Sequence, residues 1–87
     1  MVALTLYGKA GCHLCEEARE AIEAVAAERR LELSEVDVSL DPRLNARYGE
    51  RIPVLAIDGE EVFELGVGEE ELRAELTRRA AGPGPIE

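Results

Sequence analysis

The residues best suited to chemistry are two cysteines, Cys12 and Cys15, which stand three positions apart in this 87-residue chain. Residues at this spacing are neighbours on a helix, so the two thiols would lie within reach of a disulfide bond. A thiol at the start of a helix faces unpaired backbone N–H groups and the positive end of the helix dipole, which favours its thiolate. The spacing therefore predicts that Cys12 attacks a disulfide and that Cys15, one turn further in and shielded from solvent, resolves the mixed disulfide.

Charged residues surround the cysteine pair. Lys9 adds a positive charge that stabilises the Cys12 thiolate, whereas Glu16 and Glu17 add negative charges that oppose it. We therefore expect a moderate activation of Cys12. His13 stands between the cysteines and is expected to tune their redox potential rather than to transfer a proton.

Other uses of a cysteine pair require different surroundings. A structural disulfide across three residues would staple almost nothing, so chemistry is the better reason for the pair. A zinc site needs four ligands, and the chain offers two cysteines and one histidine. We therefore expect no metal site within one chain. An iron–sulfur cluster or metal carried between two chains, which together supply four thiolates, stays open as the alternative.

The composition limits the classes of function. Ten basic and 19 acidic residues give a formal net charge of −9, which argues against binding nucleic acid or an anionic membrane surface. The length fits one small domain, and a hydrophobic content of 46% argues against disorder. No apolar stretch is long enough to span a bilayer, and the first residues lack a signal-peptide pattern. We therefore expect a cytoplasmic monomer in a reducing compartment.

The hydrophobic periodicity predicts an α/β domain in the order β-α-β-α-β-β-α. Strands are expected over residues 2–7, 31–38, 54–57 and 61–65, and helices over 12–29, 42–48 and 69–79. The first strand should be interior and covered on both faces because no charge interrupts it. The second should start late or carry a bulge near Ser34-Glu35, where its apolar residues change parity.

These elements should form a mixed four-stranded sheet with helices on its faces. The first β-α-β unit is expected to be parallel and right-handed. The turn at Asp58-Gly59 makes the last two strands antiparallel. The domain should cover residues 1–80, and the glycine- and proline-rich residues 81–87 should form a flexible tail.

Two segments carry a resemblance to a known family. The string from Tyr7 to Cys15 (Tyr-Gly-Lys-Ala-Gly-Cys-His-Leu-Cys), followed by Arg51-Ile52-Pro53 before the third strand, resembles small bacterial glutaredoxin-like proteins. The resemblance covers about residues 2–80 and implies a thioredoxin-like fold of the glutaredoxin type. It also implies a thiol–disulfide oxidoreductase and a cis peptide bond before Pro53.

The resemblance also implies where substrates bind. A cis Pro53 would leave the Ile52 backbone free to pair with an extended peptide. The residues expected to contact substrate are Tyr7, Lys9, His13, Arg51, Ile52 and Pro53. The expected substrates are protein or glutathione mixed disulfides, and the dithiol would be regenerated by reduced glutathione or a thioredoxin-type reductase. No metal or bound organic cofactor is expected.

The segment expected to bind glutathione departs from the family pattern. Glutaredoxins typically carry two adjacent glycines before the last helix, whereas this chain has Gly66-Val67-Gly68 followed at once by Glu69-Glu70-Glu71. Three carboxylates there would repel the γ-glutamyl carboxylate of glutathione. Lys9, Arg47 and Arg51 are expected to form a basic rim that meets its other carboxylate.

Overall fold

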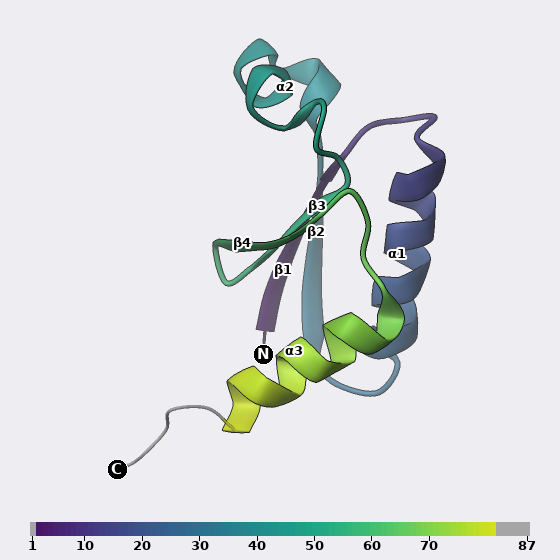
Figure 1. Cartoon of the computed structure of the whole chain (residues 1–87), viewed down its shortest axis with the longest axis vertical. Helices are drawn as coiled ribbons and strands as arrows, with labels where there is room; N and C mark the ends of the chain where they lie inside the picture. The colour runs from purple at the N-terminus through teal and green to yellow at the C-terminus, as the bar shows by residue number, and fades with distance from the viewer. Residues whose placement is uncertain (1, 82–87) are drawn as a thin grey trace.

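The computed structural model describes residues 2–81 of the chain. The elements are β1 (Val2–Gly8), α1 (His13–Ala26), β2 (Leu31–Asp37), the 3-10 helix η1 (Val38–Leu40), α2 (Pro42–Tyr48), β3 (Val54–Ile57), β4 (Glu60–Glu64) and α3 (Glu69–Ala81) (Figure 1). The expected tail over residues 81–87 lies outside the described residues apart from Ala81, which ends α3.

The four strands form one mixed sheet in the order β2-β1-β3-β4. β1 and β2 are parallel, while β3 is antiparallel to both β1 and β4. Helices α1 and α3 pack on one face of the sheet, and η1 and α2 pack on the other face at one end (Figure 1). The predicted α/β fold class and element order are confirmed.

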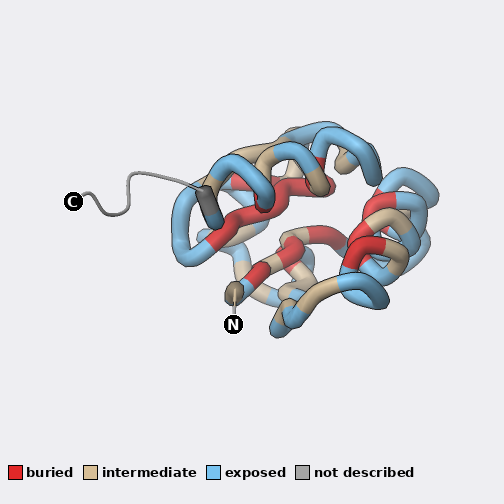
Figure 2. The backbone as a smooth tube through the Cα atoms, turned by 90° about the horizontal axis from the view of Figure 1, so that it is seen from below, coloured by how far each residue is buried: buried red, intermediate tan, exposed pale blue. Residues whose placement is uncertain are grey.

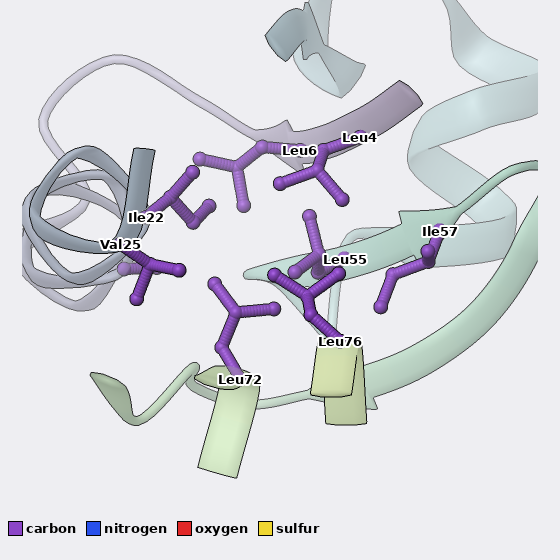
Figure 3. Close-up of a cluster of buried hydrophobic side chains, with 9 residues drawn as sticks. Leu4, Leu6, Ile22, Val25, Leu55, Ile57, Leu72 and Leu76 are labelled. Carbon is purple, nitrogen blue, oxygen red and sulfur yellow. The ribbon is translucent and has the colours of Figure 1, made fainter. Parts of the chain in front are cut away.

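The main core lies between the sheet and the helices α1 and α3. Its buried side chains come from β1, β3 and both helices (Figure 3): Leu4, Leu6, Ala18, Ile22, Val25, Leu55, Ile57, Leu72 and Leu76. A smaller cluster of Val38, Tyr48 and Val54 lies on the opposite face. Figure 2 shows the buried residues along the inner sides of the elements, with exposed residues outside. The core therefore fixes α1, and with it the cysteine pair, against the central strands.

The central strand β1 is less covered than expected. It lies between β2 and β3, so its interior position is confirmed. However, Ala3 is exposed and Thr5 is only half-buried. The reason is that α2 has seven residues and packs only near Tyr7, at the end of the strand. The expectation that β1 is covered on both faces was therefore wrong.

The second strand carries no bulge and does not start late. β2 pairs with β1 without interruption from Leu31 to Asp37. Its apolar residues change parity because Leu33 packs on the main core, whereas Val36 pairs with Tyr7 on the other face. The irregularity of the sheet lies instead between β3 and β4.

Two helices differ in length from the prediction. α1 is shorter at both ends, because Cys12 is extended and caps the helix, and Ala27 already ends it. α3 continues to Ala81, two residues beyond its predicted end. The start of α2 is as predicted, because the Asp41 carboxylate accepts a hydrogen bond from the Arg43 N–H at 2.9 Å.

Candidate active site

Cys12 and Cys15 are joined by a disulfide bond, with their Cα atoms 5.2 Å apart. Cys12 is the N-cap of α1, and its Sγ accepts a hydrogen bond from the Cys15 backbone N–H at 3.1 Å. Cys12 is half-buried, whereas Cys15 lies one turn further in and is only 7% exposed. The two sulfurs therefore differ in access: solvent reaches Cys12 more readily than Cys15.

Close packing of β1 against α1 places the pair. Gly8 ends β1, and a Cβ atom built on it would lie only 2.9 Å from the Cys15 Sγ. The connecting loop turns where the Cys12 N–H bonds to the Lys9 carbonyl, and Gly11 adopts a φ of +79° that suits glycine. These two glycines let the chain pass from the strand to the helix beside the buried sulfur.

The Ile52–Pro53 peptide bond is cis, as predicted. Pro53 is buried and directly precedes Val54, which pairs with Tyr7 near the end of β1. The cis bond therefore lies at the end of the sheet from which the loop to Cys12 departs. Ile52 is half-buried and packs against the smaller core cluster.

Tyr7 takes part in an aromatic stack. The centroids of the Tyr7 and Tyr48 rings lie 4.2 Å apart, with an angle of 16° between the two ring planes. The buried Tyr48 hydroxyl donates a hydrogen bond to Glu61 at 2.9 Å. Burial, assisted by the bond to Glu61, raises the pKa of Tyr48 to about 12. The stack therefore links β1 to α2 and to β4.

Arg51 is held by two carboxylates. Its Nε donates to Glu64 at 3.0 Å, and its Nη2 donates to Glu61 at 2.7 Å. The hydrogen bonds that Arg51 donates, first to Glu61 and second to Glu64, raise its pKa because they favour its charged form. Arg47 also donates to Glu61, at 3.3 Å. Both arginines of the expected basic rim are therefore paired within the fold.

Two depressions adjoin the loop that carries Lys9. One, of about 520 Å³, is lined by Lys9, Arg47 and Arg51 together with parts of α2 and the residues after it. The other, of about 260 Å³, reaches Cys15 and is bordered by β1, β2 and α1. Lys9 lines both. The structure thus brings the three expected cations to one depression, with Arg47 and Arg51 already bound to carboxylates.

His13 is not among the residues that line these two depressions. Its side chain is 82% exposed, and its Nε2 lies 2.8 Å from the carboxylate of Glu17, one helical turn along.

The acidic segment at the start of α3 makes contacts within its own helix and with the residue before it. Glu69 pairs with Arg73 at 2.8 Å, and the Glu71 carboxylate lies against Gly68.

Three residues at this end of the sheet were not predicted from the sequence: Tyr48, Glu61 and Glu64. A signal was present in β4, which reads Glu60-Glu61-Val62-Phe63-Glu64. Two adjacent apolar residues between acidic ones break the alternation of a regular strand, as a bulge does.

Neither a metal cluster nor a membrane span emerges from the described part of the chain. Within residues 2–81, no three or more histidine, cysteine, aspartate or glutamate side chains gather in a way that could hold a metal ion. No helix in the same range has both the length and the apolar character needed to cross a bilayer.

Several known proteins are similar to this chain in sequence and fold. The sequence profile of the glutaredoxin-like domain (DUF836) matches residues 3–77. An uncharacterized protein of Mycobacterium tuberculosis is 32% identical over 85 residues, covering 92% of this chain and 88% of that protein. The X-ray structure of a structural-genomics target from X. campestris is 37% identical, with a TM-score of 0.71 over 92% of this chain and 99% of that one. A mutant thioredoxin from Halobacterium salinarum is 26% identical, with a TM-score of 0.66 over 97% of this chain and 78% of that thioredoxin.

Proposed function

The chain belongs to the glutaredoxin-like domain family, and from this membership we propose that it is a thiol–disulfide oxidoreductase. One observation carries the proposal: Cys12 and Cys15 form a disulfide at the start of α1 in which one sulfur is accessible and the other is buried. A pair that alternates between dithiol and disulfide needs this difference, because substrate must reach one sulfur and be displaced by the other.

In the reductive direction, the Cys12 thiolate attacks one sulfur of the substrate disulfide. The substrate S–S bond breaks, its other sulfur leaves as a thiolate and takes up a proton, and a mixed disulfide with Cys12 forms. Cys15 then loses its proton and attacks the Cys12 sulfur, which releases the second substrate thiol. The substrate gains two electrons, and the protein pair becomes the disulfide.

The start of α1 supports the role of Cys12 as the attacking group. Its Sγ already accepts a hydrogen bond from the Cys15 N–H at 3.1 Å, and such a bond stabilises a thiolate. The helix dipole adds a positive potential at the same place. Cys15 packs closely against Gly8 and is only 7% exposed, which suits a resolving thiol.

The proposed substrates are protein disulfides or glutathione mixed disulfides. An extended peptide would pair with the backbone of Ile52, next to the cis bond of Pro53. The proposed electron donor is reduced glutathione or a thioredoxin-type reductase. We further propose that the protein acts as a monomer in the cytoplasm and needs no metal or bound organic cofactor.

Two substitutions test the mechanism. Cys12→Ser should abolish reduction of a protein disulfide, because no thiolate remains to attack it. Cys15→Ser should accumulate the mixed disulfide, visible by mass spectrometry, or keep only monothiol activity with glutathione. Serine is nearly isosteric in both variants, so each serves as the folding control for the other. An active Cys12→Ser protein would contradict the assignment, and an iron-containing coloured dimer after anaerobic purification would favour a cluster carrier instead.

A further inference from the structure

The irregularity between β3 and β4 changes which way two glutamates face. Val54 pairs with Glu64 and Ala56 pairs with Glu61, so one residue of β4, Val62, is left over between them. Residues three apart in a regular strand point to opposite faces of a sheet. The extra residue cancels this difference, so Glu61 and Glu64 both lie on the face of the sheet that packs against α2.

These two carboxylates accept hydrogen bonds from the guanidinium group of Arg51. Its Nε donates to Glu64 and its Nη2 to Glu61, while its Nη1 donates to the Arg47 carbonyl at 3.4 Å. All three nitrogens therefore have acceptors. A guanidinium binds an incoming carboxylate best through two parallel N–H groups. Three of the five N–H groups are thus engaged, and an anionic ligand at Arg51 would compete with Glu61 and Glu64 and meet their negative charge.

The charges around the depression of about 520 Å³ cancel. The cationic side chains that line it are matched in number by carboxylates that line it or bind its arginines: Lys9, Arg47 and Arg51 against Glu50, Glu61 and Glu64. The depression borders the loop that leads to Cys12, because Lys9 belongs to both. It therefore offers no net attraction to an anion that approaches the disulfide.

We propose that Glu61 and Glu64 determine which thiol reduces the Cys12–Cys15 disulfide. They neutralise Arg51, so the site gives an anionic thiol such as glutathione no advantage over an uncharged thiol or dithiol. This inference rests on the proposed function and removes charge as a reason for glutathione to be its electron donor. Two thiols supply the electrons: the first attacks the protein disulfide and forms a mixed disulfide, and the second displaces it, which yields the oxidised thiol and the protein dithiol.

Three small thiols of similar size test the proposal: cationic cysteamine, neutral 2-mercaptoethanol and anionic 3-mercaptopropionate. The rate at which each reduces the protein disulfide is followed by alkylation and mass spectrometry. Each rate is divided by the rate of the same thiol with a small uncharged disulfide, which removes differences in intrinsic reactivity. For the unmodified protein, we expect the corrected rate with the anionic thiol to be no higher than that with the neutral thiol.

The double variant Glu61→Gln with Glu64→Gln removes the two charges and keeps an oxygen that can accept the Tyr48 hydrogen bond. It should raise the anionic-to-neutral ratio roughly fivefold at low salt, and high salt should abolish the gain. The matched control is Glu23→Gln with Glu32→Gln, two exposed residues whose replacement changes the net charge equally. The control should leave the ratio within about twofold of the unmodified protein.

The proposal is overturned if the double variant and the control give the same ratio, or if the unmodified protein already favours the anionic thiol. Should the double variant fail to fold, Glu64→Gln alone replaces it, since the Glu64 side chain contacts Arg51 and leaves the Tyr48 bond intact. Failure of the broader function has a different signature. In that case the reduced protein does not reduce a disulfide substrate, whichever of the three thiols was used to reduce it.

Discussion

The contact between Gly8 and Cys15 allows a quantitative test of how the redox pair is positioned. In Gly8→Ala, the new Cβ would lie 2.9 Å from the Cys15 Sγ and 3.2 Å from its Cβ. Cys15 cannot move away easily, because the buried Ala18 and Ile22 hold its helix α1 against the core. Overpacking of this kind costs about 1–3 kcal/mol. We expect that loss in the free energy of unfolding, measured by urea denaturation and circular dichroism.

A double-mutant cycle separates this contact from other effects of the alanine. All proteins carry Cys12→Ser, so that no disulfide forms, and Gly8→Ala is combined with Cys15→Ala. Without the Sγ atom the nearer clash disappears, so the cost of Gly8→Ala should fall by about 1 kcal/mol or more. Gly11→Ala is the control: its site is open but has a φ of +79°, so its cost should not depend on Cys15.

If Gly8→Ala costs the same with and without the Cys15 sulfur, the glycine is not required by close packing against Cys15. A total cost below about 0.5 kcal/mol would mean that α1 shifts freely, and that the burial of Cys15 is not set by β1.

Three further outcomes follow from the contacts described. Tyr48→Phe should lower the free energy of unfolding by about 1 kcal/mol. The pKa of Tyr48 is raised from 10.0 to about 12 in the folded protein. The contribution of its hydroxyl to stability is therefore complete below pH 10 and is lost as the pH rises through about 12. Stability should fall less steeply with rising pH in Tyr48→Phe than in the unmodified protein. Hydrogen bonds, above all the one donated by Arg51, lower the pKa of Glu61. The contribution of its carboxylate to stability is therefore present above pH 4.5 and is lost as the pH falls. The melting temperature of Glu61→Gln should fall less steeply in acid than that of the unmodified protein. Leu72→Ala should cost about 2–5 kcal/mol in urea denaturation, because Leu72 is fully buried between α3 and the sheet.

Local signals in the sequence were sufficient for the elements and for the cysteine pair. Cys12 and Cys15 are linked through the first turn of one helix, so their spacing alone predicted their proximity. Likewise, Asp41 and Pro42 start α2 through contacts within a few residues. The cis bond before Pro53 is different, since it was predicted from the resemblance and not from the residues around it.

Features that depend on pairing between segments were not predictable in the same way. The parity change in β2 was interpreted as a late start or a bulge, but its cause is that the two faces of the sheet are covered by different elements. The actual extra residue, Val62, is defined only by the register of β4 against β3. As a result, the ion pairs of Arg51 with Glu61 and Glu64 were missed, and the arginine was expected to be free for a substrate.

These ion pairs change the meaning of the net charge of −9. Most arginines are bound to carboxylates within the fold: Arg19, Arg47, Arg51, Arg73, Arg78 and Arg79. Some of these pairs join elements, as Arg73 joins α3 to Glu28 after α1, and Arg79 joins α3 to β4. At physiological ionic strength, charges more than about 8 Å from a ligand are largely screened. Under the proposal above, the balanced charges near Lys9 and Arg51 govern the response of the protein to the charge of a thiol, and the acidic outer faces contribute little to it.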